Sequence, residues 1–183
     1  MIAIKKYIIP CILLSFSISA KSQFPEECRY LSVLTYLRTN TGINTSIKSQ
    51  FFKGQKNHKK DKFVHFQIND SVTFLNIYDF LDQLYLKEIG ISQDLISNPQ
   101  LYKDKYYFKP YKSEFLSKID EDSTSFIYLT FSKPIDNYII VEFGNMNPKL
   151  YGVKQWGLGL SILFKFNSLG LIEDKLYYGA AYR

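Results

Sequence analysis

The last part of the chain alternates between apolar and polar positions, which is typical of β-strands. The clearest case runs from Leu158 to Phe166, where every even-numbered residue is apolar. The turn-forming run 167–170 separates this segment from a further strand between Leu171 and Tyr178. The pattern therefore predicts a β-hairpin, and we expect the even-numbered face of 158–166 to lie in the core.

Two shorter strands are predicted before this hairpin. Apolar residues alternate in 126–132 and in 138–143, and a turn around Pro134 separates the two segments. A loop rich in glycine and asparagine, 144–157, leads into the hairpin. Because turns of this length are too short for parallel crossovers, the four strands are expected to be largely antiparallel.

The first half of the chain contains apolar residues at helical spacing. This spacing predicts a helix over 25–38, with Cys28 as a buried thiol on its apolar face, and a second helix between Asn76 and Gly90. The polar run 39–62 is predicted to be a loop. A weak alternation at 63–68 predicts one earlier strand.

These elements together predict an α+β fold. We expect an antiparallel meander sheet, made of the four C-terminal strands plus the earlier strand, packed against the two helices of the N-terminal half. The earlier strand is expected to leave the sheet through the turn-forming run 69–71.

The first twenty residues are typical of a cleaved signal peptide. Lys5 and Lys6 precede a short apolar run, and Ser19 and Ala20 offer a small-residue cleavage site. The run is too short to span a bilayer, so no transmembrane segment is expected after cleavage. We therefore predict an exported protein, periplasmic or secreted, in which residues 21–183 form a single domain.

The charge of the chain supports only a weak interaction with polyanions. The formal net charge is +6, and Lys5 and Lys6 account for two of these charges, so 21–183 carries +4. Four lysines crowd one stretch and predict either a weak contact with an anionic glycan or lipid or simply a solvated loop: Lys53, Lys56, Lys59 and Lys60. The chain has twenty lysines and only three arginines. This ratio argues against a nucleic-acid partner, because the arginine guanidinium makes the bidentate hydrogen bonds that phosphates and base edges favour.

The sequence contains no recognisable motif for a cofactor or a metal. Only two histidines are present, His58 and His65, and no His-Glu-x-x-His, Cys-x-x-Cys, nucleotide-binding loop or nucleophile elbow occurs. We therefore expect neither a cofactor nor a metal site.

The polar face of the predicted sheet contains the best candidates for a site. Tyr128, Tyr138, Glu142 and Lys165 alternate with core positions, so they are predicted to bind a ligand. Glu142 and, less directly, His65 are the candidate catalytic groups. The alternative interpretation is a cross-strand ion pair between Glu142 and Lys165 on a wet sheet face.

Two functions from different classes follow from these observations. The first is a small exported, non-catalytic domain that binds a ligand or an envelope protein. The alternative is a small hydrolase or isomerase on a cone-like α+β fold that uses the sheet-face carboxylate of Glu142. The order of elements is compatible with both, since a fold does not determine a function.

Overall fold

The computed structural model describes residues 25–52, 64–75, 83–88, 90–119, 125–145 and 157–182. The predicted signal peptide and the lysine-rich run with Lys53, Lys56, Lys59 and Lys60 lie outside these residues. The predicted start of the second helix at Asn76 and most of the loop 144–157 also lie outside them.

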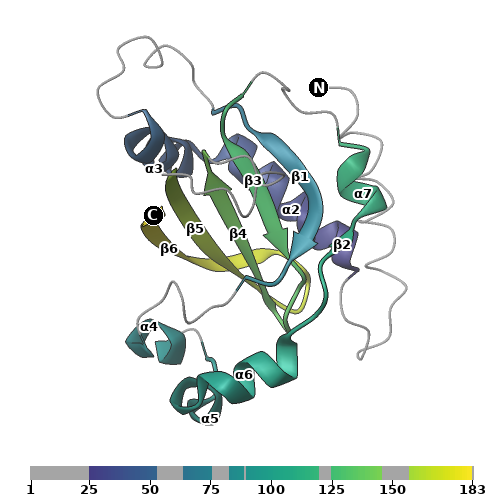
Figure 1. Cartoon of the computed structure of the whole chain (residues 1–183), viewed down its shortest axis with the longest axis vertical. Coiled ribbons are helices and arrows are strands. Elements are labelled where there is room, and N and C mark those ends of the chain that lie inside the picture. Colours follow the sequence, from purple (N-terminus) through teal and green to yellow (C-terminus); the bar gives the residue numbers. More distant parts are fainter. Residues whose placement is uncertain are drawn as a thin grey trace.

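Within the described residues, six strands form one sheet in the order β2-β1-β3-β4-β5-β6 (Figure 1). β3 to β6 are paired antiparallel in chain order, which confirms the predicted meander. β1 adds to this meander in parallel alongside β3, and the short β2 pairs antiparallel with β1. The sheet is therefore mixed. The strands are β1 (Gln67–Thr73), β2 (Tyr111–Lys112), β3 (Tyr128–Ser132), β4 (Tyr138–Gly144), β5 (Gly157–Phe166) and β6 (Ile172–Tyr182).

β1 lies further along the chain than the sequence pattern indicated. The predicted strand was 63–68, with a turn at 69–71, but residues 69–71 lie within β1. Asn69 donates its side-chain amide to the Thr130 hydroxyl at 3.3 Å, and Ser71 pairs with Lys112 of β2. Pairing with the neighbouring strands thus outweighs the turn preference of this polar run.

One face of the sheet is covered by α2 (Glu26–Thr39) and α3 (Thr41–Phe51). α2 is the predicted first helix, whereas α3 lies in the run predicted to be a loop, so that prediction is wrong. Asn40 begins α3 by accepting the Ile43 amide at 3.0 Å with its side chain. The buried apolar residues of α3 recur every four positions and anchor it to the core: Ile43, Ile47 and Phe51.

The opposite face of the sheet is covered at one end. There α4 (Gln83–Glu88), α5 (Gln93–Ser97) and α6 (Pro99–Tyr106) gather at the lower end of the view in Figure 1. Leu86 and Ile96 from these helices form a second apolar cluster with Ile140 and Leu163 of the sheet. The short α7 (Glu114–Ser117) follows β2 and packs against β1. The face predicted to be polar is therefore partly a helix interface.

The predicted core face of β5 is largely confirmed. Leu160, Ile162, Phe164 and Phe166 are buried, but Leu158 is 37% exposed and does not belong to the core.

Cys28 is buried as predicted. It is disulfide-bonded in the full-length chain, whereas the thiol was predicted for residues 21–183, in which Cys28 is the single cysteine. The other cysteine of the chain, Cys11, lies outside the described residues. None of the helices in the described ranges is both long enough and apolar enough to cross a membrane.

Candidate binding cleft

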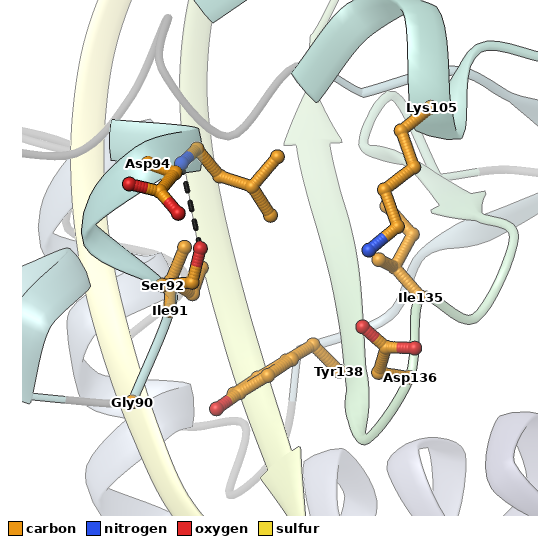
Figure 2. Close-up of a pocket in the computed structure, with 9 residues that line it drawn as sticks. Gly90, Ile91, Ser92, Asp94, Lys105, Ile135, Asp136 and Tyr138 are labelled. Atoms are coloured by element: carbon orange, nitrogen blue, oxygen red, sulfur yellow. Dashed lines mark hydrogen bonds between the residues drawn. The ribbon is translucent and has the colours of Figure 1, made fainter. Parts of the chain in front are cut away.

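A cleft of about 390 Å³ lies where the α4 to α6 layer meets the β3–β4 turn. This volume is at the lower end of the roughly 300–1,000 Å³ that small-molecule sites occupy. Figure 2 shows the residues that line it. They come from the α4–α5 connection, α5, α6, the β3–β4 turn and β4: Gly90, Ile91, Ser92, Asp94, Leu95, Lys105, Ile135, Asp136 and Tyr138.

The β3–β4 turn forms one wall of the cleft. Ile135 and Tyr138 exchange two backbone hydrogen bonds of 2.9 and 2.8 Å, and this tight closure places Asp136 in the left-handed region at a φ of 49°. Aspartate tolerates that region better than most residues. On the far side of the turn, the Arg29 Nη1 donates to the backbone carbonyl of Asp136. The hydrogen bond from Arg29 thus holds the backbone of the turn, while the Asp136 side chain lines the cleft.

The opposite wall depends on the way α4 ends and α5 begins. Gly90 has a φ of 88°. Its backbone amide donates to the Lys87 carbonyl at 3.0 Å, and the Ile91 amide donates to the Leu86 carbonyl at 3.0 Å. This is the hydrogen-bond pattern of a Schellman motif, which favours glycine at the left-handed position. Two residues later, Ser92 caps α5 by accepting the Leu95 amide at 3.4 Å. The chain therefore changes direction sharply between α4 and α5, and α5 packs against the sheet through Ile96.

Asn98 and Pro99 begin α6, which brings Lys105 to the cleft. The Asn98 side chain accepts the amides of Gln100 and Leu101 at 3.1 and 3.3 Å, and Pro99 occupies the first turn. In Figure 2 the Lys105 side chain extends toward the Asp136 carboxylate, while Asp94 lies on the opposite side of the cleft.

Tyr138 provides the hydroxyl at the base of the cleft. Its ring lies with the hydroxyl end toward Gly90 in Figure 2, and a Cβ added at Gly90 would lie 3.6 Å from that oxygen. Burial, followed by the negative charges of Asp136 and Glu173, raises the pKa of Tyr138. The hydroxyl is therefore neutral at physiological pH, and it is able both to donate and to accept a hydrogen bond.

The four predicted binding residues separate into two pairs. Tyr138 lines the cleft, and Lys165 lies opposite Tyr138 on β5, although it does not line the cleft itself. Glu142 lies four residues further along β4, about 13 Å from Tyr138 at strand spacing. Tyr128 is a diagonal neighbour of Glu142, because Tyr128 pairs with Gly144 and Glu142 pairs with Thr130.

The alternative ion pair between Glu142 and Lys165 is wrong. The register places Glu142 opposite Ser161, and the Lys165 Nζ is 3.7 Å from the Glu173 Oε2. Glu142 is half-buried between Thr130 and Ser161, both of which are buried. Among the described residues, the Ser161 Oγ finds no hydrogen-bond partner.

His65 does not lie close to Glu142. It is exposed just before β1, and its backbone carbonyl accepts the Ser125 hydroxyl at 2.7 Å. Two strand spacings and about four residues of strand length separate it from Glu142, on the order of 15 Å. The two candidate catalytic groups are thus too far apart to share a proton directly.

The polar residues of the cleft other than Tyr138 were not predicted. Asp94, Lys105 and Asp136 come from three separate elements, so their spacing in the sequence does not mark a site. Within the described ranges, no group of three or more histidine, cysteine, aspartate or glutamate side chains is arranged to hold a metal ion. Comparison of the chain with protein-family models, curated proteins and solved structures finds no match.

Proposed function

We propose that the protein is a small exported, non-catalytic domain that binds a small ligand in the cleft between the β3–β4 turn and α5. The observation that carries this proposal is the cleft itself, which combines an apolar lining with polar groups that converge from several elements. Pockets that bind small molecules have this composition.

The lining favours an amphipathic ligand. Ile91, Leu95 and Ile135 supply apolar surface for its body. Tyr138 supplies a hydroxyl, and charged groups of both signs stand at Asp94, Lys105 and Asp136. We therefore propose a ligand with a short hydrocarbon or aromatic part and a head group that carries an amine, a carboxylate or both.

A fragment screen by ligand-observed NMR tests this proposal. The probes are aliphatic and aromatic amines, carboxylic acids and amino acids, and we expect amphipathic members to bind to the 21–183 protein. Ile135→Trp should abolish this binding by filling the cleft. Tyr177→Phe, on an exposed side chain of β6, is the control and should bind like the wild type.

Either of two outcomes would overturn the cleft proposal. One is the absence of any amphipathic hit. The other is a set of hits that bind equally well to Ile135→Trp. The native protein should also be purified and its extract analysed by mass spectrometry for a co-purifying amphipathic small molecule.

Export is tested separately, by the mass of the protein recovered outside the cytoplasm. Cleavage after Ala20 predicts a mature chain that begins at Lys21. Recovery of the chain with Met1 intact would contradict the signal-peptide assignment and would leave the cleft proposal unaffected.

The alternative function, a hydrolase or isomerase that uses Glu142, rests on a different observation. Glu142 is half-buried and lies opposite Ser161, whose buried hydroxyl has no hydrogen-bond partner among the described residues. We rank this function second because the described cleft lies at the other end of the sheet face. A panel of ester and glycoside substrates tests it: turnover that Glu142→Gln abolishes, with the fold intact, would favour the enzyme.

A further inference from the structure

Four aromatic rings form a continuous chain of contacts beside the C-terminal end of β1. Phe74 is central, with its ring centroid 5.6 Å from that of Tyr107 and 6.3 Å from that of Phe108. Phe108 in turn contacts Tyr111 at 5.9 Å. The two phenylalanines are half-buried against the core, whereas Tyr107 is 59% and Tyr111 is 37% exposed. The tyrosines are thus the solvent-facing ends of a supported aromatic chain.

Lysines surround these tyrosines. Lys103 lies one helical turn before Tyr107 and accepts its amide at 2.8 Å through the backbone carbonyl. Lys109 lies between the two tyrosines in the sequence. Lys112 directly follows Tyr111 in β2, and the Nζ of Lys112 is 3.3 Å from the Asp70 carboxylate. All three lysines are exposed. We call the following residues the aromatic–lysine surface: Phe74, Lys103, Tyr107, Phe108, Lys109, Tyr111 and Lys112.

A short extended segment separates Tyr107 from Tyr111. Tyr107 has extended dihedrals, φ −60° and ψ 137°, and Pro110 biases Lys109 toward extended conformations as well. The backbone positions of Tyr107 and Tyr111 are therefore at most about 14 Å apart. The two exposed rings lie at the ends of one row of aromatic contacts, and the exposed Lys109 belongs to the segment that joins them.

The exposed rings are held in place from beneath. The Tyr111 hydroxyl donates to the Glu26 Oε1, and Tyr107 contacts Phe74, whose apolar neighbours belong to the second cluster. Rings that are already ordered lose little conformational entropy when a partner binds. None of the residues of the aromatic–lysine surface lines the cleft, so the two surfaces can be tested independently.

We propose that the aromatic–lysine surface binds an anionic polysaccharide. Tyrosine rings offer flat apolar faces to the C–H faces of sugar rings, and the neighbouring lysines complement carboxylate or sulfate groups on the same polysaccharide. The segment 99–112 contains no arginine, which disfavours nucleic acid because arginine is the preferred fork for phosphates and bases. The exposed aromatics are tyrosines, while both phenylalanines stay half-buried, and this disfavours insertion into a lipid surface.

Titration with size-defined oligosaccharides tests this proposal. The probes are a sulfated hexasaccharide from heparin, a polyuronic acid hexasaccharide and an uncharged glucose hexamer, each at about 50 and about 200 mM salt. We expect the two anionic probes to bind and the uncharged probe to bind more weakly. Tyr107→Ala should weaken binding about five- to tenfold at both salt concentrations, because the lost contact is largely apolar. Lys109→Gln should weaken binding mainly at low salt.

Tyr177→Ala and Lys87→Gln are the matched controls, since both side chains are exposed on other elements. They should bind like the wild type, and circular dichroism should show the same fold for all four variants. The proposal is overturned if neither anionic probe binds, or if Tyr107→Ala binds as well as the wild type. It is also overturned if a single-stranded DNA 12-mer or anionic vesicles bind more tightly than the anionic oligosaccharides with the same dependence on Tyr107.

Discussion

Arg29 of α2 donates a hydrogen bond from Nη1 to the backbone carbonyl of Asp136 in the β3–β4 turn. The side chain is only 4% exposed, and the guanidinium carbon lies 5.7 Å from the centre of the Phe166 ring. Burial lowers the pKa of Arg29, and the negative charges of Asp136 and Glu26 oppose this effect. A helix on one face of the sheet thus supports the turn that forms a wall of the cleft near the other face.

Replacement of Arg29 should therefore destabilise the protein. Arg29→Met keeps much of the side-chain volume but removes the donor to the Asp136 carbonyl, so we expect the free energy of unfolding to fall by about 1–3 kcal/mol. Urea unfolding measures this change. Arg38→Met, near the C-terminal end of the same helix, is the control and should cost less than about 1 kcal/mol. A neutral or stabilising Arg29→Met would mean that desolvation of the guanidinium outweighs its hydrogen bond.

The contacts of Glu26 predict a loss of stability at alkaline pH. Its Oε1 accepts hydrogen bonds from Tyr30, at 2.6 Å, and from Tyr111. Burial first, and then the hydrogen bond to Glu26, raises the pKa of both tyrosines. A raised pKa means that the folded state holds its protons more tightly than the unfolded state. The stabilisation is fully present below the unfolded tyrosine pKa of about 10, and it is lost as the pH rises toward the folded value.

Tyr111→Phe isolates part of this effect. At neutral pH it should cost about 0.5–1.5 kcal/mol, because one hydrogen bond to the carboxylate is lost. Above about pH 10 the difference from the wild type should shrink, since only the wild type still has this tyrosine to titrate. Urea unfolding at intervals from about pH 8 to about pH 11 measures both quantities. A difference that stays constant or grows over this range would contradict the assignment.

The second apolar cluster predicts a large effect at Leu163. This residue is 3% exposed and packs with Leu86 and Ile96 of the covering helices. Leu163→Ala should lower the free energy of unfolding by about 2–5 kcal/mol, because it leaves a cavity between two layers. Leu169→Ala, at a residue that is 67% exposed in the β5–β6 turn, should change it by less than about 0.5 kcal/mol. Equal effects in the two variants would show that α4 and α5 do not cover this face in solution.

Gly90 should show a graded response to substitution. Its φ of 88° is unfavourable for a side chain, so Gly90→Ala is expected to cost about 1–2 kcal/mol. Gly90→Asn should cost less, since asparagine tolerates the left-handed region better. Thermal unfolding of the three proteins measures the order of stability, which we expect to be Gly, then Asn, then Ala. An alanine variant as stable as the wild type would be inconsistent with the left-handed end of α4.

The sequence was most informative where local pattern and tertiary position agree. Alternation along 126–143 and along β5 predicted the meander, because each strand buries one face against α2 and α3. α3 was missed although Ile43, Ile47 and Phe51 recur at helical spacing, since the surrounding residues are polar and favour a loop. A weak apolar stripe is thus enough to form a helix when the stripe packs against the sheet.

The site was less accessible to the same reasoning. Ile140 and Leu163 are apolar residues on the face predicted to be polar, and they were the signal that helices cover it. That signal locates a layer but does not specify which loop residues meet at its edge. Asp94, Lys105 and Asp136 come together only because three elements dock at one end of the sheet. Tyr138 was predicted because strand alternation alone places it on the correct face.

The parallel pairing of β1 with β3 also has a consequence for the order of folding. Gln67 pairs with Tyr128, which lies 61 positions later, whereas β3 and β4 are joined by a turn of a few residues. Closing the longer loop costs about 2 kcal/mol more in chain entropy. We therefore expect the nucleus to form within β3 to β6 and β1 to dock late. Substitutions in β1 should then mainly accelerate unfolding, while substitutions in the meander should slow refolding.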